Sequence, residues 1–253
     1  MVKSYNKGKV KPKKSTRQIV RDEISKMSET KKKMTTLQEL LLCPRSQSTS
    51  TGGASPGMQI YQINDVAKGP ANDERIGNSI HITGLSLRGL LHGRGLTING
   101  STSQNAVYVR HAILKKKAAS DITEINAYDT RIFLNNNTSL SYESANNVQR
   151  YILPFNHKDF DIVFQKTEKL GIVNTPNTQN YFNNKKVSFY NRQNYKCEWF
   201  SDSSSFNDEC NPGLYYIVFV GNINMDDSQF AGNEITLGAA EVNMALNVYY
   251  KDM

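Results

Sequence analysis

Closely spaced lysines near the start of the chain are the residues whose type and spacing most clearly predict a chemistry. The stretch KGKVKPKK, from Lys7 to Lys14, holds five lysines in eight positions. Residues 1–33 carry twelve Lys and Arg against three acids, a net charge of +9, whereas the whole chain is +8 and residues 34–253 sum to −1. A flexible cationic segment binds polyphosphate by counterion release, without reading base sequence. We therefore predict a nucleic-acid-binding arm that uses Lys3, Lys7, Lys9, Lys11, Lys13, Lys14, Arg17, Arg21, Lys26, Lys31, Lys32 and Lys33.

Two other roles for these cations stay open. A basic tail can serve solubility alone, but the charge is segregated so fully into one segment that nucleic-acid binding is favoured. A nuclear-localisation signal made of Lys9, Lys11, Lys13 and Lys14 would use only part of the basic residues. Such a signal is compatible with nucleic-acid binding in the same arm.

Residues with catalytic or metal-binding potential form no recognisable site. The four histidines, His81, His92, His111 and His157, lack metal-ligand spacing, and we expect structural roles for them. GLSLRG (84–89) lacks the second glycine of a nucleophile elbow, and the sequence contains no P-loop. The carboxylates in DFD (159–161) and DD (226–227) could bind calcium, but solvated turn residues are the favoured interpretation. The sequence therefore predicts neither an enzyme nor a cofactor or metal site.

The cysteines also argue against stabilisation by disulfides. Cys43, Cys197 and Cys210 are an odd number and form no CxxC pair. This usage favours assembly inside a cell. We also expect no signal peptide, because the first residues are charged. The longest apolar run, at 214–220, is too short to span a bilayer, so no membrane span is predicted.

Composition and periodicity divide the chain into three parts. Residues 1–42 are expected to form the basic arm, disordered over 1–15 and partly helical over 16–42, because apolar residues recur there at three-to-four spacing. Residues 43–57 are rich in Ser, Thr, Gly and Pro and are expected to form a flexible linker. Residues 58–253 are expected to form the folded domain.

Alternating apolar residues predict eight strands in this domain: 79–91, 105–117, 150–155, 160–166, 185–191, 195–200, 214–220 and 240–252. The alternation slips by one residue at Gly84, which predicts a β-bulge. The run at 214–220 is continuously apolar, which predicts burial on both faces. No long helix separates the strands, so parallel pairing is disfavoured. The predicted fold is all-β: a single eight-stranded antiparallel jelly roll, a two-sheet sandwich, with a disordered basic N-terminal arm.

Three stretches carry a resemblance to a known family. They are ERIGNSIHITGLSLRGLL (74–91), with Arg75 and Gly77 before an alternating strand, QRYILPFNHKDFDIVF (149–164), and the ending NVYYKDM. Together with the arm and the β-rich domain, they resemble the capsid proteins of small circular single-stranded-DNA (CRESS-DNA) viruses. The coat protein of satellite tobacco necrosis virus is a related comparison for the fold. Circovirus-like members of the family have arginine-dense arms. This arm differs from them, because all of its basic residues except Arg17 and Arg21 are lysines.

The resemblance implies a self-assembling virion protein. The expected particle is a small icosahedral T=1 shell of 60 copies, whose arms point inward and package a single-stranded genome, expected to be DNA. The host nucleus is the expected assembly site, with the nuclear import machinery as a further partner. Apolar loop residues are candidates either for subunit contacts or for anchoring loops within one subunit: Ile132, Phe133, Leu134, Tyr142, Phe206 and Phe230.

Other functions stay open. One is the coat protein of a small RNA virus, whose arm has a similar composition. Another is a non-viral nucleic-acid-binding β protein of ribosomal or chromatin type, which usually carries basic patches and stacking aromatics on the folded domain itself. A carbohydrate-binding or cupin-like jelly roll is a third, but it would need clustered ligands and has no use for the arm.

Overall fold

The computed structural model describes part of the chain. The described residues are 15–18, 29–42, 57–93, 96–98, 101–103, 107–118, 120, 125, 130–142, 144–173, 181–182, 184–199, 210–222, 235–237 and 240–252. Most of the predicted arm, the predicted linker up to residue 56, and Phe206 and Phe230 lie outside them. The prediction of disorder over 1–15 falls almost entirely outside the described residues.

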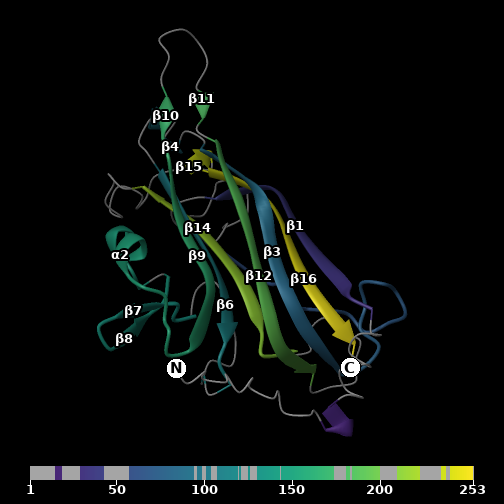
Figure 1. Cartoon of the computed structure of the whole chain (residues 1–253). Helices are drawn as coiled ribbons and strands as arrows, with labels where there is room; N and C mark the ends of the chain where they lie inside the picture. The colour runs from purple at the N-terminus through teal and green to yellow at the C-terminus, as the bar shows by residue number, and fades with distance from the viewer. Residues whose placement is uncertain are drawn as a thin grey trace, which may run out of the picture.

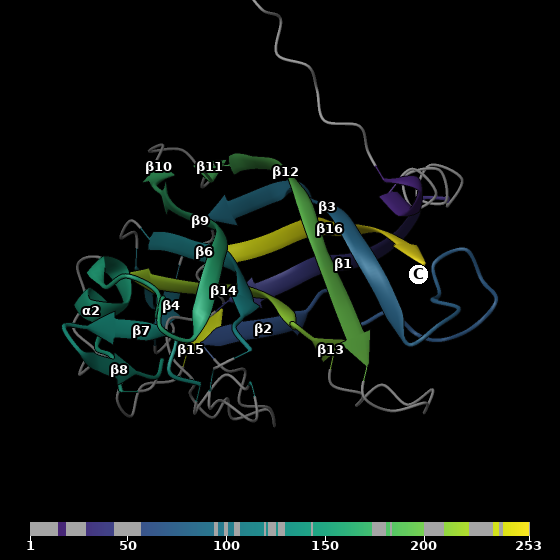
Figure 2. The same cartoon turned by 60° about the horizontal axis from the view of Figure 1, so that its bottom comes forward.

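Two antiparallel sheets, packed face to face, make up the fold (Figures 1 and 2). Sheet A has the order β1 (Lys31–Leu42), β16 (Ala240–Asp252), β3 (Ser79–Gly93), β12 (Asn184–Trp199) and β13 (Cys210–Asn211). Sheet B has the order β2 (Met58–Gln62), β14 (Leu214–Asn222), β6 (Val107–Lys116) and β9 (Phe160–Leu170). The prediction of an all-β, antiparallel two-sheet sandwich is confirmed.

Short strands and a short helix lie outside the two main sheets. Strands β4 (Leu96–Ile98), β5 (Ser101–Ser103) and β15 (Ile235–Leu237) form a three-stranded sheet. Two short hairpins pair β7 (Phe133–Asn135) with β8 (Thr138–Leu140) and β10 (Ile172–Val173) with β11 (Tyr181–Phe182). The short helix α2 (Asn147–Ile152) lies beside β7 and β8 in both views (Figures 1 and 2).

The main core lies between the two sheets because each strand turns alternate side chains inward. In β16, the side chains from Val242 to Tyr250 at every second position are buried. From the other sheet, Val107, Val109 and Ile113 of β6 join the same core, and His111 is buried on this face as the alternation predicts. Tyr216, Val218 and Val220 of β14 also belong to this core.

A second core covers the opposite face of sheet B. Ile217 and Phe219 of β14 pack there, so the prediction that this strand is buried on both faces is confirmed. Their partners come from the segment 130–155. Ile132, Phe133 and Tyr142 belong to this core, and Leu134 is 6% exposed. These four apolar residues therefore anchor a loop within one subunit, and their alternative role as subunit contacts is wrong in this fold.

The predicted bulge is present at the first half of β3. The pairing with β16 runs from Tyr249–Gly84 directly to Tyr250–Ile82, which leaves Thr83 unpaired in the register. The pairing with β12 shifts at the same point. The bulge lets the apolar residues on both sides of it face the core.

The helical prediction for residues 31–42 is wrong, because this segment is the strand β1. Its apolar spacing fits both periods, but pairing with β16 along almost its whole length decides the structure. A bulge at Glu39, whose φ is 51°, brings Leu37, Leu40 and Leu42 to one face. Only residues 16–18 of the predicted helical region are helical among those described. The boundary predicted at residue 42 therefore separates β1 from the sheet to which it belongs.

Two of the predicted strands are also corrected. Residues 150–155 do not form a strand, because α2 begins at Asn147 and ends at Ile152. The Asn146 side chain accepts a hydrogen bond from the Gln149 N–H, and the Gln149 side chain accepts one from the Asn146 N–H, a capping box that starts the helix. The segments 185–191 and 195–200 are one strand, β12, which is bent by the register shift.

Candidate nucleic-acid interface

The predicted arm joins the folded domain at the first residue of β1. Lys31 Nζ lies 2.8 Å from Asp252 Oδ2 at the end of β16 and donates a hydrogen bond to Glu74 O at 2.9 Å. The Lys31 side chain is only 14% exposed, so this ion pair is well shielded from water. The fold therefore fixes the point from which the preceding residues leave sheet A.

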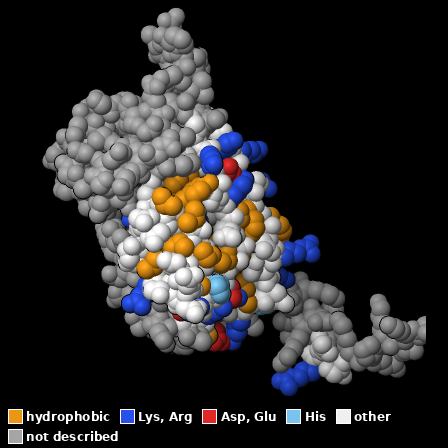
Figure 3. Space-filling view, turned by 90° about the vertical axis from the view of Figure 1, so that its left-hand side faces the viewer, with side chains coloured by type: hydrophobic (Ala, Val, Ile, Leu, Met, Phe, Trp, Pro, Cys, Tyr) orange, Lys and Arg blue, Asp and Glu red, His pale blue; other side chains and the backbone are white. Residues whose placement is uncertain are grey.

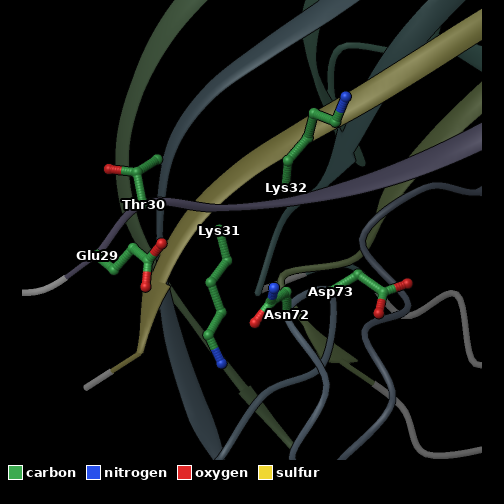
Figure 4. A pocket seen from close by; sticks show the side chains of 6 residues that line it. All are labelled: Glu29, Thr30, Lys31, Lys32, Asn72 and Asp73. Atoms are coloured by element: carbon green, nitrogen blue, oxygen red, sulfur yellow. The ribbon is translucent and has the colours of Figure 1, made fainter.

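A pocket of about 330 Å³ marks this junction. Its lining comes from the start of β1 and from the loop before β3: Glu29, Thr30, Lys31, Lys32, Asn72 and Asp73. Figure 4 shows Lys31 pointing toward Asn72, whereas Lys32 points to the opposite side of the strand. Acidic and basic side chains both line the pocket, so it has no strong preference for an anion. The lysines of this junction thus have different environments, although they are consecutive in sequence.

The structure places only part of the predicted binding set, and the binding role of every member stays a prediction. Arg17, Lys32 and Lys33 are described; Arg17 and Lys32 are exposed and Lys33 is half-buried. Lys31 is occupied by the contacts above, which give it a structural role. The remaining predicted residues lie outside the described residues: Lys3, Lys7, Lys9, Lys11, Lys13, Lys14, Arg21 and Lys26. Their binding role, and the nuclear-localisation signal, stay predictions.

A basic surface that the sequence analysis missed lies on sheet A. We call the side of this sheet that faces away from sheet B the outer face. It presents one residue in two from each strand and carries six cations and two acids: Lys32, Arg88, Lys186, Arg192, Lys196, Lys251, Glu198 and Glu241. These eight side chains sum to +4, and the seven of them that belong to residues 34–253 sum to +3, although that whole segment sums to −1. The signal in the sequence was that Lys186, Arg192 and Lys196 all fall at even-numbered positions of one strand, which a count of charge over the whole domain hides.

The surface on the side of α2, β7 and β8 has a different character. Figure 3 looks onto this side and shows hydrophobic side chains gathered in its middle, with Lys and Arg side chains toward the edges. Val148 and Ile152, one turn apart on α2, are 60% and 63% exposed. Apolar side chains on a helix surface are typical of sites where another protein packs.

Arg75, the arginine of the resemblance motif, has a structural environment. Its side chain is 2% exposed and lies over the Trp199 ring, with 4.3 Å between Cζ and the ring centroid. Nε donates to Val66 O at 3.1 Å, and Nη1 donates to Gly77 O at 2.6 Å. The guanidinium therefore ties the loop before β3 to the end of β12.

Sheet B contains a second buried arginine, Arg110 of β6. Arg110 Nη1 donates to Arg150 O in α2 at 2.7 Å, and its Cζ lies 4.3 Å from the Phe155 ring centroid. Burial lowers the pKa of Arg110 to about 10, partly offset by nearby Tyr108. The guanidinium thus stays charged at neutral pH while it joins the second core to the sheet.

His111 has the structural role that its position predicts. Its Nδ1 lies 3.2 Å from Tyr216 Oη, and its ring meets the Phe164 ring edge to face. Burial, and secondarily the charge of Lys166, lowers the pKa of His111 to about 3. The imidazole is therefore neutral at physiological pH and lies inside the main core.

The described cysteines lie side by side in the core. Asn64 Nδ2 donates to Cys197 Sγ at 3.4 Å and to Cys210 Sγ at 3.3 Å. The hydrogen bond between the two thiols lowers the pKa of Cys197 and, together with burial, raises that of Cys210. Both cysteines are free thiols. They close the end of the sandwich where β12 pairs with β13.

The calcium candidates use their carboxylates in contacts within the protein. Asp161 Oδ2 lies 2.9 Å from Lys115 Nζ, and Asp159 accepts hydrogen bonds from Asn156 and Ser120. Within the part of the chain that the structure describes, no three metal-binding side chains cluster. Asp226 and Asp227 lie outside that part.

Comparisons with known proteins add no assignment. A search of protein-family models found no match to this chain, and neither did a search of curated protein sequences. No helix in the described ranges is long and apolar enough to cross a membrane.

Proposed function

We propose that this chain is a viral capsid protein, which self-assembles into a small icosahedral shell and packages a single-stranded genome through its lysine-rich arm. The observation that most strongly supports this proposal is the junction at Lys31. There a strongly basic segment enters an edge strand of a nearly neutral two-sheet β domain. A T=1 shell of 60 copies is the simplest assembly. The genome is single-stranded, and DNA is our first choice over RNA.

The order of the strands supports the finer fold assignment, a single jelly roll. Leaving out the two-residue β13, the two facing sheets are built, in chain order, from β1, β2, β3, β6, β9, β12, β14 and β16, which we number 1 to 8. In these numbers sheet A has the order 1-8-3-6 and sheet B the order 2-7-4-5. Successive strands alternate between the sheets except at the step from β6 to β9, which are neighbours in sheet B, as in two nested Greek keys. Viral capsid domains are a major class with this architecture.

The charge distribution supports the inward orientation of the arm. Sixty arms with a net charge of +9 would carry about 540 positive charges, enough to neutralise a comparable number of phosphates. A nearly neutral domain avoids mutual repulsion when sixty copies meet. The exposed apolar pair Val148 and Ile152 replaces the buried loop residues as the candidate for subunit contacts.

The first test is negative-stain electron microscopy of the purified protein together with its absorbance ratio at 260 and 280 nm. Closed, uniform particles with a high ratio are expected. The decisive variant changes the nine Lys and Arg residues between Lys3 and Lys26 to Gln in the full chain, which leaves β1 and the Lys31–Asp252 pair intact. We expect particles without nucleic acid.

The matched control replaces only the lysines among these nine residues by Arg, which keeps the charge. It should package nucleic acid as the unaltered chain does, because non-specific phosphate binding depends mainly on charge. Full packaging by the Gln variant would refute the role of the arm. A chain that stays monomeric at low salt with nucleic acid would refute the capsid assignment.

The outer face of sheet A favours a second candidate, a non-viral nucleic-acid-binding β protein. Basic residues beside an exposed aromatic ring on a folded domain, as around Tyr190, are typical of such proteins. This candidate predicts a monomer or small oligomer that binds nucleic acid without forming particles, so the same microscopy separates the two functions.

A further inference from the structure

We propose that the outer face of sheet A is itself a binding site for single-stranded nucleic acid, with Tyr190 as a base-stacking platform between cations. This inference rests on the proposal that the chain binds nucleic acid, but it assigns a site separate from the arm. The occupant is a flexible single strand, because such sites combine a basic track for phosphates with aromatic rings for bases.

One row of residues across the sheet defines the centre of the site. Cross-strand pairing aligns Lys32 with Tyr249, Tyr249 with Gly84, and Gly84 with Arg192. Because neighbouring strands lie about 4.8 Å apart, this row places a cation at each side of a central strip about 14 Å wide. Lys32 and Arg192 are both exposed.

In the middle of this row, Gly84 leaves space that the Tyr190 ring occupies. Gly84 has no side chain, and a Cβ there would lie 3.4 Å from Tyr190 Oη, so Tyr190 reaches over the glycine. The Tyr190 and Tyr249 rings meet edge to face, with their centroids 6.4 Å apart, and Tyr249 Oη lies 3.4 Å from Ser86 Oγ. These contacts orient Tyr190, yet the residue is 61% exposed. A large aromatic side chain held in water on a sheet surface is a suitable partner for a base.

The cations continue along β12 and define a track. Lys186, Arg192 and Lys196 all lie on the outer face of this strand with Tyr190 between them, and Arg88 pairs with Ser188 from the neighbouring strand. Ten residues separate Lys186 from Lys196, which corresponds to about 33 Å of extended strand. Such a length accommodates several nucleotides in a single-stranded site.

Edge protection is the main alternative explanation of these charges. Lysines on edge strands prevent unwanted sheet pairing, and β12 is paired on its far side only by the two-residue β13. However, Arg88 and Lys251 lie on β3 and β16, two strands that are paired on both sides within sheet A. Edge protection also gives no reason for an oriented, exposed tyrosine in the centre of the face.

The location of the face agrees with that of the arm. Lys32 belongs both to the predicted binding arm and to the outer face, since the basic segment 1–33 runs into the first residues of β1. A strand of nucleic acid bound at Lys32 therefore already lies at the outer face. In a shell with inward-pointing arms, this face would turn toward the interior.

The experiment measures binding of fluorescently labelled oligo(dT) and oligo(U) by anisotropy at several salt concentrations, with full-length protein. The test variant is K186Q/R192Q/K196Q. The control, K158Q/K166Q/K169Q, makes the same charge change on and next to β9 of sheet B. Each phosphate contact adds about 0.7 to the slope of log K against log salt for a single strand. Because Lys196 also forms an ion pair with Glu198, the test variant should lose about one to two units. The control should keep the slope of the unaltered chain.

Stacking is tested separately at Tyr190. Y190A should weaken binding at least about fivefold, whereas Y190F, which keeps the ring, should stay within about twofold of the unaltered chain. An oligonucleotide with 5-iodouracil should crosslink on irradiation to the tryptic peptide of residues 187–192, which contains Tyr190. Equal slopes for the test and control variants, or equal binding by Y190A and Y190F, would overturn the site.

Failure of the site and failure of the proposed function have different signatures. The Gln-substituted arm variant, assayed with the same oligonucleotides, isolates the contribution of the outer face. K186Q/R192Q/K196Q can be added to the Gln-substituted arm variant. If this addition lowers the slope of log K against log salt, the result supports the site even if the arm variant still packages nucleic acid. No binding of either oligonucleotide by the unaltered chain would refute both proposals.

Discussion

Protonation of His111 gives the fold a defined sensitivity to acid. The pKa of this buried imidazole is lowered from 6.5 to about 3, first by burial and then by the charge of Lys166 on the neighbouring strand β9. Between these two values the unfolded chain binds a proton that the folded chain does not bind. The free energy of unfolding therefore falls as the pH falls below about 6.5, by about 1.4 kcal/mol per pH unit.

The variant H111N removes this titration and keeps a polar group near Tyr216 Oη, the partner of His111 Nδ1 in the core. Between about pH 7 and about pH 5.5, His111 should account for a loss of about 1.2 kcal/mol in the free energy of unfolding. H111N should lack this part of the pH dependence, whatever its stability at neutral pH. The exposed His157 offers a matched control, since H157Q should keep the full dependence.

Urea denaturation followed by tryptophan fluorescence measures these free energies, because Trp199 is buried in the main core. All variants are compared at the same dilute protein concentration, so that subunit association contributes equally. An unchanged pH dependence in H111N, or a loss of the dependence in H157Q, would refute the assignment of acid sensitivity to the buried imidazole.

Two further substitutions test the packing of the sheets. G221A should destabilise the fold by about 1–3 kcal/mol, since a Cβ at Gly221 would overlap the buried Tyr108 ring. G84A should change the stability by less than about 0.5 kcal/mol, because its Cβ would make an ordinary contact with Tyr190. Equal denaturant midpoints for the two variants would contradict this packing. R75K should cost about 2–4 kcal/mol, because a lysine cannot replace both the bonds to Val66 O and Gly77 O and the contact with Trp199. The exposed R131K is the control, expected within about 0.5 kcal/mol, and equal thermal shifts for the two variants would exclude a structural role of Arg75.

The sequence predicted best those features in which local pattern and tertiary packing agree. The alternation in 240–252 identified β16, and the phase slip at Gly84 identified the bulge in β3. The continuous apolar run in 214–220 indicated a strand buried on both faces, as β14 is. In each case the side-chain period is set by the same two-residue repeat that decides which face is buried.

The prediction of eight strands contains errors in both directions, and the two facing sheets together hold nine strands. It counted β12 twice and took the region of α2 for a strand, and it missed β1 and β2. Residues 31–42 have apolar spacing compatible with either period, so the partner strand β16 decided the outcome. The short β2 carries too few residues for a period to be recognised, and its pairing with β14 defines it.

What the sequence determined by itself is the division of charge: a strongly basic segment before a nearly neutral, strand-rich domain. Charge is a sum over residues, so it can be read without knowing the fold. Only the tertiary structure decided where that division falls and how charge is arranged on the domain. Lys31 became an anchor rather than a free cation because Asp252, at the far end of the chain, lies beside it. Cations spread from Lys32 to Lys251 became one surface because antiparallel pairing brings four distant strands into register on one face.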